Sequence, residues 1–229
     1  MKKQEFVELE SLVNTRDKLV KLRTKLKNKI HNLLLANGIL TKREQFSSQK
    51  SLERVKSLQG LSEVSQFELD FVCDEISYLN EKIKVLDEKI ISIAEDIKGF
   101  KNLTSIKGIG ERSAAILLST IGNVEDFKTQ KNLDAYFGIV PRVKNTSNTI
   151  NHGRITKRGS QVARATLIQC TLIAIRYSPY LRDFFKKLKA AKRGGKAIIA
   201  TARKLLGIIY NTLKNNWVFD DFPNFVFKA

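Results

Sequence analysis

Residues 69–97 read LDFVCDEISYLNEKIKVLDEKIISIAEDI, and nine apolar positions in this run, from Leu69 to Ile97, recur at alternating spacings of three and four residues. Glu and Lys side chains surround these positions. A stripe of this kind, sustained over four heptads, is typical of a coiled-coil helix. At 1.5 Å per residue the stripe is about 44 Å long. The alternative is a long helix that packs on a globular core.

A second amphipathic helix is expected over residues 5–36, because leucines recur every seven residues from Leu12 to Leu33. Asn37 and Gly38 end it, since both residues enter the left-handed conformation easily. A polar connector, residues 41–60, follows. The partner of the 69–97 helix is either this first helix, folded back as an antiparallel hairpin, or the same helix in a second chain. The length and regularity of the stripe favour self-association, so we expect a homo-oligomer formed through the coiled coil.

The composition indicates an all-α protein, with three prolines and a hydrophobic content of 42%. Three further helices are expected over residues 160–176, 179–193 and 195–216. We therefore predict a long coiled-coil helical hairpin in residues 1–99, followed by a compact helical domain in residues 100–229. Cys73 and Cys170 lie in apolar helical patterns and are expected to be reduced core residues. No signal peptide or membrane-spanning run is apparent, so we expect a cytoplasmic protein without a membrane partner.

Charge is concentrated in one part of the chain. Between Lys131 and Lys204 there are 17 Lys and Arg residues and two acids, so this window holds +15 of the net +18. A solvated surface normally mixes charges of both signs, whereas a one-sided block favours a polyanionic partner. DNA is the partner that we expect. Binding to a membrane surface is disfavoured, because the apolar residues of the window are needed for packing.

Ile106-Lys-Gly-Ile-Gly110 has the form of the turn in a helix-hairpin-helix motif. Two glycines one residue apart permit positive φ and close approach. The helix expected after Gly110 would present its N-terminal N–H groups to a phosphate, with Lys107 and Arg112 beside them. Such a contact positions nucleic acid without reading its sequence. The alternative is a joint between two helices that binds no ligand.

Two segments around a polar stretch carry a resemblance to a known family: Ala135-Tyr-Phe-Gly-Ile-Val-Pro-Arg142 and Gly153-Arg-Ile-Thr-Lys-Arg-Gly159. Together they resemble the C-terminal transposase domain of DEDD-type insertion-sequence transposases, the bridge-RNA-guided recombinases of bacterial mobile elements. The glycine turn upstream, the helix that begins at Ser160 and the preceding heptad helix match the same family. The resemblance implies transposition or site-specific recombination of DNA, with a guide RNA as a second partner.

The resemblance also implies a catalytic hydroxyl in the polar stretch. Counted from Gly138, the serine nucleophile of the family falls on Thr146, with Ser147 next to it. Cations around the scissile phosphate would neutralise the charge that develops during reaction. His152 is a candidate base, although a loop histidine is more often a phosphate contact. The candidate DNA-binding residues are Lys107, Gly108, Gly110, Arg112, Arg142, Lys144, Arg154, Lys157, Arg158 and Arg164.

Transposases of this kind begin with an RNase-H-like domain whose four acidic residues bind magnesium. Residues 1–60 have no strand pattern, and no carboxylate cluster elsewhere in the chain suggests a metal site. We therefore expect the DNA-binding and strand-joining part of a truncated or split transposase, inactive alone, with no cofactor in this chain. Magnesium would be bound only with the acidic domain.

Two other classes of protein compete with this interpretation. One is a non-catalytic helix-hairpin-helix module, in which the hydroxyl-bearing loop only holds a phosphate. The other is a coiled-coil scaffold protein, which explains the heptads and leaves the basic window without a purpose.

Overall fold

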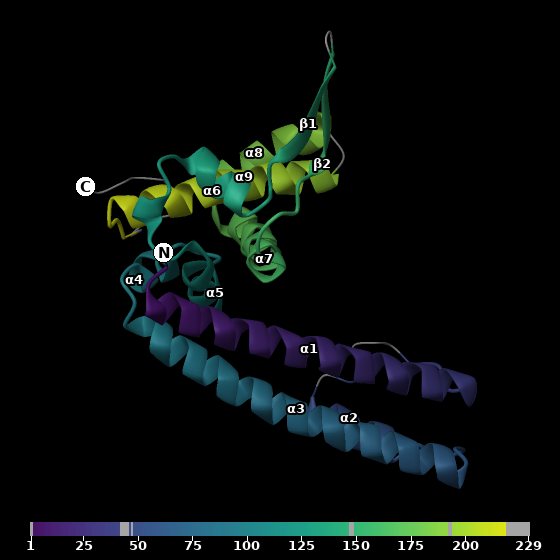
Figure 1. Ribbon diagram of the computed structural model, residues 1–229. Helices are drawn as coiled ribbons and strands as arrows, with labels where there is room; N and C mark the ends of the chain where they lie inside the picture. Colours follow the sequence, from purple (N-terminus) through teal and green to yellow (C-terminus); the bar gives the residue numbers. More distant parts are fainter. Residues whose placement is uncertain (1, 42–45, 47, 147–148, 192–193, 219–229) are drawn as a thin grey trace. The chain divides into compact units, whose positions relative to one another are not determined.

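The computed structural model of the chain describes residues 2–41, 46, 48–146, 149–191 and 194–218, and of residues 144–146 and 149–152 it describes the backbone alone. The described residues are mostly helical, with one β-hairpin among them, and the all-α prediction is therefore confirmed (Figure 1). The chain divides into two compact units. One comprises residues 14–89, and the other comprises residues 1–13 together with residues 90–229.

The unit of residues 14–89 is a helical hairpin. Helices α1, Gln4–Ala36, and α3, Glu63–Glu95, run antiparallel in it. Arg16 in the first half of α1 donates to Asp87 in the second half of α3 at 2.8 Å. Farther along α1, Lys29 pairs with Glu68 in the first half of α3 at 2.5 Å. The stripe on α3 therefore has a partner within its own chain, which is the first of the two arrangements considered above.

The core of this hairpin unit also includes a short helix from the connector. Helix α2, Gln49–Lys56, begins at Ser48, whose hydroxyl caps the backbone N–H of Ser51. Its side chains pack with those of α1 and α3 in one buried cluster, made of Ile30, Leu34, Phe46, Leu52, Val55, Leu69, Val72, Cys73 and Ile76. Because Leu69, Val72 and Ile76 are buried there, this part of the a/d stripe is covered by the chain itself.

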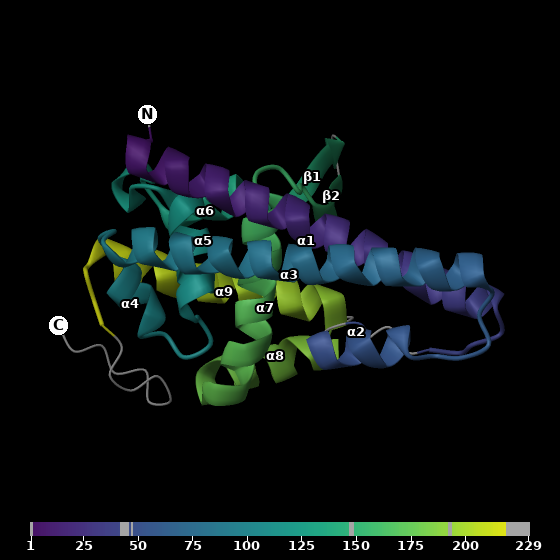
Figure 2. The same cartoon turned by 90° about the horizontal axis from the view of Figure 1, so that it is seen from below.

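The other unit contains the remaining elements. These are α4 (Phe100–Thr104), α5 (Glu111–Ile121), a 3-10 turn η2 (Val124–Asp126), α6 (Gln130–Tyr136), β1 (Pro141–Thr146), β2 (Thr149–Ile155), α7 (Gln161–Tyr177), α8 (Pro179–Ala191) and α9 (Gly194–Lys214). Helix α7 packs against α5, α8 and α9 (Figure 2). Phe6 and Leu9 of α1 and Ile90 of α3 are buried in the same core, so this unit extends beyond the predicted 100–229 segment.

The boundaries of the helices follow their local signals. Ser160 caps α7, since its hydroxyl accepts a hydrogen bond from the backbone N–H of Ala163 at 3.2 Å.

The two cysteines are free thiols, as expected: Cys170 is buried in the core of its unit and Cys73 is buried in the hairpin unit. Trp217 follows α9, and its carbonyl accepts a hydrogen bond from Asn102 at 2.6 Å. The other tail aromatics, Phe219, Phe222, Phe225 and Phe227, lie outside the described residues.

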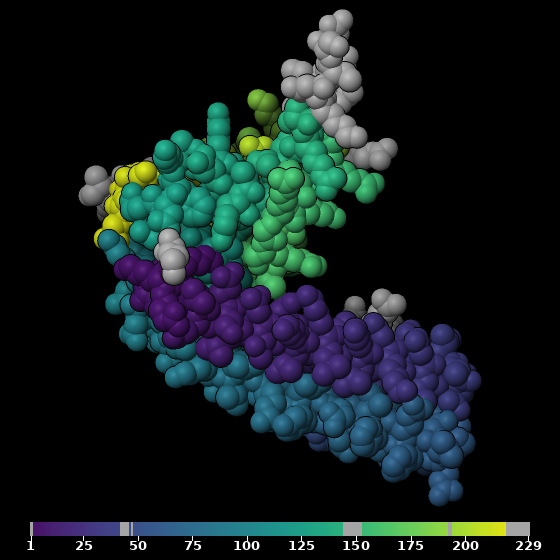
Figure 3. Space-filling model, viewed as in Figure 1, coloured from purple at the N-terminus to yellow at the C-terminus, as the bar shows by residue number. Residues whose placement is uncertain are grey.

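The segment that the sequence analysis expected to be a loop is a β-hairpin. Strands β1 and β2 pair antiparallel and extend away from the helices of their unit (Figure 1). In the space-filling view, the coloured parts of the chain that enter and leave the hairpin, in teal and green, lie next to each other (Figure 3). The strand pattern is difficult to see in the sequence because charged and polar residues occupy most positions of this exposed hairpin. Among the described residues, no helix is both long enough and apolar enough to span a membrane.

Candidate nucleic-acid interface

Two glycines bring the ends of the β-hairpin together. Gly138 has φ +65° and Gly159 has φ +83°, a conformation that favours glycine. A methyl group on Gly138 would overlap the carbonyl oxygen of Arg158, and one on Gly159 would overlap the carbonyl oxygen of Tyr136. The backbones before and after the hairpin therefore cross at a distance that only glycine permits.

Arg164 on α7 holds this crossing from the inside. Its side chain is buried, and Nη1 donates to the carbonyl oxygens of Phe137 and Arg158, each at 3.1 Å, and of Gly159 at 3.4 Å. Burial lowers the pKa of Arg164, although a guanidinium stays charged in proteins. Sequence analysis placed Arg164 among the DNA-binding residues. The structure places it inside the domain, where it supports the loop that carries the exposed cations.

A β-bulge lies at the base of the hairpin, between Pro141 and Val143 of β1. Pro141 pairs with Ile155 and Val143 pairs with His152, so two residues of β2, Gly153 and Arg154, face one residue of β1. The residue they face is Arg142, which is exposed. The bulge thus brings the guanidinium-bearing residues 142 and 154 to the same end of the hairpin.

The candidate nucleophiles are at the other end of the hairpin. Thr146 is the last residue of β1, and its backbone pairs with that of Thr149. The structure does not describe the side chain of Thr146, and Ser147 lies outside the described residues. Lys144 and His152 are placed on β1 and β2 by their backbones alone. The assignment of Thr146 or Ser147 as a nucleophile therefore remains a prediction.

A groove lies between the base of the β-hairpin and the first half of α9. It has a volume of about 1060 Å³. Four cationic side chains line it: Arg154, Lys157, Lys196 and Arg203. Its other lining residues are Ile139, Pro141, Gly153, Ile155, Ala191, Gly195, Ile199 and Ala200, so the lining contains no acid among the described residues. The lining of the groove therefore combines apolar side chains with four positively charged ones.

Arg203 is held at the groove by a buried carboxylate. Asp134 on α6 is about 2% exposed, and its Oδ2 accepts from Nε and Nη2 of Arg203, each at 3.5 Å. Burial raises the pKa of Asp134, while the nearby guanidinium opposes this shift. The other oxygen, Oδ1, has no hydrogen-bond partner among the described residues. Asp134, one of the two acids inside the basic window, thus orients one cation of the groove.

Sequence analysis found part of this groove. Arg154 and Lys157 were both expected to bind DNA, and both line it. Arg158 is exposed beside them, but it does not line the groove. Lys196 and Arg203 were missed as individual sites. Their spacing of seven residues, which puts them on one face of a helix, is the signal that would have found them.

The glycine turn lies at a separate place in the same unit. Helices α4 and α5 flank it, Ile106 and Ile109 are buried, and Lys107 and Arg112 are exposed. Gly108 has φ +110°, and a methyl group there would lie 2.9 Å from the backbone nitrogen of Ala174 on α7. Gly110 has an ordinary φ of −83° and nothing within 4 Å of the position of a Cβ. Only Gly108 requires glycine, while Gly110 leaves the start of α5 open.

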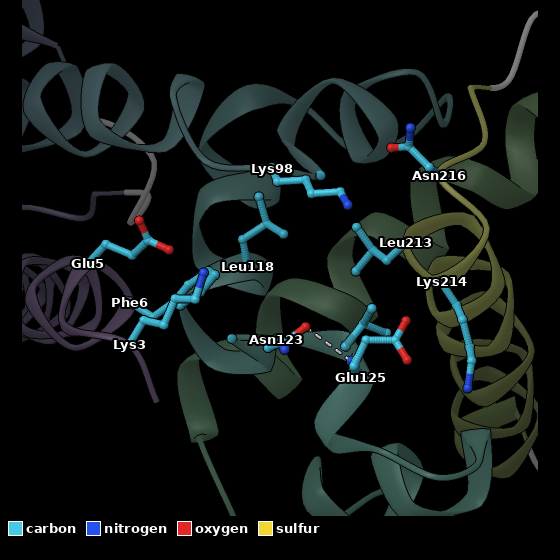
Figure 4. Close-up of a pocket in the computed structure, with 13 residues that line it drawn as sticks. Lys3, Glu5, Phe6, Lys98, Leu118, Asn123, Glu125, Leu213, Lys214 and Asn216 are labelled. Atoms are coloured by element: carbon cyan, nitrogen blue, oxygen red, sulfur yellow. Dashed lines mark hydrogen bonds between the residues drawn. The ribbon is translucent and has the colours of Figure 1, made fainter. Parts of the chain in front are cut away.

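A second cavity in this unit has mixed charges. It has a volume of about 370 Å³, and Figure 4 shows Lys98 and Lys214 in it together with Glu5 and Glu125. The backbone N–H of Glu125 donates to the side chain of Asn123 at 3.2 Å. Both acidic and basic side chains line this cavity, so it offers a polyanion less attraction than the groove does.

The described parts of the chain contain no group of three or more His, Cys, Asp or Glu side chains that could hold a metal ion. The adjacent acidic pairs Glu125-Asp126 and Asp220-Asp221 form no such group among the described residues. Glu125 and Asp126 lie in the turn η2, and Asp220 and Asp221 are outside the described residues. The described residues do not fit a magnesium site, and no reaction step is assigned to a metal here.

A groove lined by four cations, and by no acid among the described residues, attracts polyanions. Residues 100–186, which are less than half of the chain, match the model of the Transposase IS116/IS110/IS902 family. This segment is similar to an IS110/IS116-family transposase domain. It contains the glycine turn, the β-hairpin and the helix α7 that holds the hairpin.

The relatives of the chain are transposases and gene-inverting proteins. A putative transposase of Sinorhizobium fredii is 29% identical over 157 residues, which cover 69% of this chain and 41% of the relative. The transposase for insertion sequence element IS1111A of Coxiella burnetii is 28% identical over 212 residues, 90% of this chain and 58% of the relative. A pilin gene-inverting protein of Moraxella bovis is 26% identical over 199 residues, 84% of this chain and 61% of the relative. The chain spans about half the length of the curated relatives it matches.

Proposed function

We propose that this chain is the DNA-binding part of an insertion-sequence transposase, and that its groove grips a sugar-phosphate backbone. The observation that carries the proposal is the convergence of Arg154, Lys157, Lys196 and Arg203 around one groove whose lining has no acid among the described residues. These cations come from β2, from the loop after it and from α9, so the fold gathers residues that are up to 49 positions apart. Phosphate contacts of this kind supply affinity without sequence specificity.

The glycine turn provides a second backbone contact. The first N–H groups of α5 lack helical acceptors, and the open position of Gly110 lets a phosphate approach them. Lys107 and Arg112 are exposed on either side of the turn and add positive charge. In this role the turn acts as a helix-hairpin-helix that positions DNA relative to the groove.

Strand joining is assigned to a hydroxyl near the turn of the β-hairpin, Thr146 or Ser147. A hydroxyl requires activation before it attacks phosphorus, where it would form a protein–DNA phosphodiester as one P–O bond breaks and a deoxyribose hydroxyl of the cut strand leaves with the proton that the attacking hydroxyl gives up. Cations nearby would stabilise the negative charge that forms. The family resemblance adds a magnesium-binding acidic domain for cleavage and a guide RNA as a second polyanion. The acidic domain and the guide RNA rest on the resemblance, whereas self-association of the chain rests on the length and regularity of the 69–97 stripe. The cations of the groove serve DNA and RNA backbones equally.

A non-catalytic nucleic-acid-binding module is the second candidate. The observation that favours it is the lack of a candidate base within the groove lining among the described residues. The two candidates differ in covalent chemistry. A complex of the chain with the acidic domain and element-end DNA should form a covalent protein–DNA adduct, and the Thr146→Ala/Ser147→Ala variant should lose it while retaining DNA affinity. If the adduct still formed in this variant, neither the Thr146 nor the Ser147 hydroxyl would be the nucleophile.

Salt dependence tests the groove itself. DNA affinity should fall steeply as salt rises from 50 to 200 mM, because each phosphate contact releases counterions. The Arg154→Ala/Lys196→Ala variant should reduce the slope of log K against log salt by about 1.8, which corresponds to two lost contacts. Lys18→Ala/Lys25→Ala removes the same charge from exposed positions of α1 and should leave the slope nearly unchanged. Equal slopes in the two variants, or a flat response in the wild type, would refute the proposed interface.

A further inference from the structure

The groove between the β-hairpin and α9 has more apolar surface than phosphate binding requires. Eight of its twelve lining residues have no polar side chain. Three of these, Pro141, Ile155 and Ile199, are half-buried, so part of their surface stays open to the groove. A phosphate gains nothing from such neighbours, whereas every nucleobase has a flat π-face that packs well against them. The lining therefore suits a second part of a nucleotide besides its phosphates.

The wall formed by α9 sets an apolar residue between two cations. Lys196, Ile199 and Arg203 follow one another at spacings of three and four residues, so they share one face of the helix. The two cations are about 10 Å apart along the helix axis, and Ile199 lies between them. Arg203 pairs with Asp134, yet its side chain is 40% exposed, and a guanidinium has further donors for a phosphate. Long side chains at this spacing can reach the phosphates on either side of one nucleoside.

The wall formed by the hairpin repeats this order. Arg154, Ile155 and Lys157 follow along the chain, and all three line the groove. Pro141 pairs with Ile155 across the hairpin and adds apolar surface beside it. A base that lies between Ile155 and Ile199 has apolar side chains on both of its faces. Proteins hold nucleotides that are turned out of a stack in this way.

The volume of the groove limits its occupant. About 1060 Å³ is close to the upper end of the range for small-molecule pockets, roughly 300–1000 Å³. A nucleotide fits in such a space, and a double helix does not. In a duplex the faces of each base are also covered by the neighbouring bases, so the apolar residues of the two walls would have no partner. The occupant that matches both size and lining is an unpaired nucleotide.

The polar side chains of the lining can only donate hydrogen bonds. They belong to Arg and Lys, which have no acceptor, and the other lining residues have no polar side chain. Phosphate oxygens accept, so DNA and RNA satisfy the cations alike. The 2′-hydroxyl of RNA must also donate, and no side chain of the described lining accepts from it. The groove therefore fits deoxyribose better than ribose.

We propose that the groove binds one unpaired nucleotide of a DNA strand, with its base between Ile155 and Ile199 and its flanking phosphates at the cations of the two walls. The inference rests on the proposed function and names the part of the DNA that the groove receives. Contacts with the faces of a base do not distinguish sequences, so the site accepts any base.

Oligonucleotides of equal length separate contact with a base from contact with phosphates. The full chain is titrated with a single DNA strand, with an abasic strand that keeps every deoxyribose and phosphate, and with RNA of the same sequence. Fluorescence anisotropy measures each Kd. The DNA strand should bind about fivefold or more tighter than the abasic strand, because only the former has bases to pack in the groove. It should also bind roughly fivefold or more tighter than RNA, whose 2′-hydroxyl is left without an acceptor.

Variants of α9 place this difference at the groove. Ile199→Ala removes apolar surface and should weaken binding of the DNA strand by about threefold or more, with a much smaller effect on the abasic strand. Ile198→Ala is the matched control, since Ile198 is also half-buried on α9 but does not line the groove, and it should change neither affinity. Ala200→Leu fills part of the groove and should also weaken binding of the DNA strand more than that of the abasic strand. Helical content and Tm verify that each variant is folded.

The outcomes distinguish this inference from the proposed function. Equal affinities for the DNA strand and the abasic strand would overturn the base contact and leave the phosphate contacts of the proposed function intact. Equal losses in Ile198→Ala and Ile199→Ala would overturn it as well. RNA that binds as tightly as DNA would reject the preference for deoxyribose and with it the DNA strand as the occupant. A chain that binds none of the three strands would refute the proposed function itself.

Discussion

The Nη1 of Arg164 donates to the carbonyl oxygen of Phe137 at 3.1 Å, and this bond joins α7 to the chain that enters the β-hairpin. The same nitrogen also contacts the carbonyls of Arg158 and Gly159, where the chain leaves the hairpin. One buried guanidinium therefore holds both ends of the segment that carries Arg142, Arg154 and Lys157. Two of the four cations that line the groove, Arg154 and Lys157, therefore depend on an arginine that does not line it.

Arg164→Ala should destabilise the fold by about 2 kcal/mol or more, since three carbonyl oxygens lose their charged donor, among them the buried carbonyl of Phe137. Arg154→Ala is the matched control, because Arg154 is exposed and should change the free energy of unfolding by less than about 0.5 kcal/mol. Urea denaturation measures both values. In DNA binding at a temperature where both variants are folded, Arg154→Ala should weaken affinity. A stable Arg164→Ala variant would contradict the internal role of this side chain.

Gly138→Ala and Gly159→Ala should each cost more than about 2 kcal/mol, because a Cβ would add left-handed strain and overlap with a backbone carbonyl. Gly194→Ala serves as the control. This glycine begins α9 and has nothing within 4 Å of the position of a Cβ, so alanine should be neutral or stabilise the helix by up to about 1 kcal/mol. Thermal denaturation distinguishes the three variants, and equal Tm values for all of them would argue against the crossing.

The two glycines of the α4–α5 turn should respond differently to alanine. Gly108→Ala would force φ +110° on a residue with a side chain and push its Cβ against the backbone of Ala174. We expect a loss of about 1–3 kcal/mol. Gly110→Ala meets no atom within 4 Å and should leave stability within about 0.5 kcal/mol of the wild type. A larger loss for Gly110→Ala than for Gly108→Ala in urea denaturation would reverse this assignment.

Asp134→Asn should stabilise the fold increasingly as pH rises. Burial raises the pKa of Asp134 in the folded chain, so between the ordinary and the raised value the folded state binds more protons than the unfolded state. Wild-type stability therefore falls as pH rises through that window, and a neutral asparagine does not contribute to this fall. The Tm difference, variant minus wild type, should increase from pH 4 to pH 7. A difference that decreases instead would mean that the ion pair with Arg203 outweighs burial.

Much of the fold follows from local patterns. The leucine repeat predicted the first helix over residues 5–36, and α1 spans Gln4–Ala36. Ser160 was expected to begin a helix, and it caps α7. Each of these features depends on neighbours within one or two turns of the chain, where spacing and capping chemistry determine the outcome. The periodicity of 69–97 likewise predicted a helix, and α3 extends it at its N-terminal end to Glu63.

The hairpin and the groove depend on longer distances. β1 and β2 form where the sequence analysis expected a loop. Their ends are brought together by the close backbone approach at Gly138 and Gly159 and by the hydrogen bonds that Arg164 donates there. Arg164 was placed among the candidate DNA-binding residues. It is buried because three carbonyls at the crossing satisfy its guanidinium. A charge count cannot distinguish a solvated arginine from one with internal acceptors.

Residue order alone accounts for the helices, their ends and the concentration of positive charge between Lys131 and Lys204, since these depend on nearby residues and on composition. Tertiary packing decided that the stripe on α3 faces α1 of the same chain, and that Lys196 and Arg203 meet Arg154 and Lys157 at one groove. The reason is physical. A heptad stripe accepts any complementary helix, and a cation is compatible with any solvated position, so the arrangement of the whole chain in space must select among them.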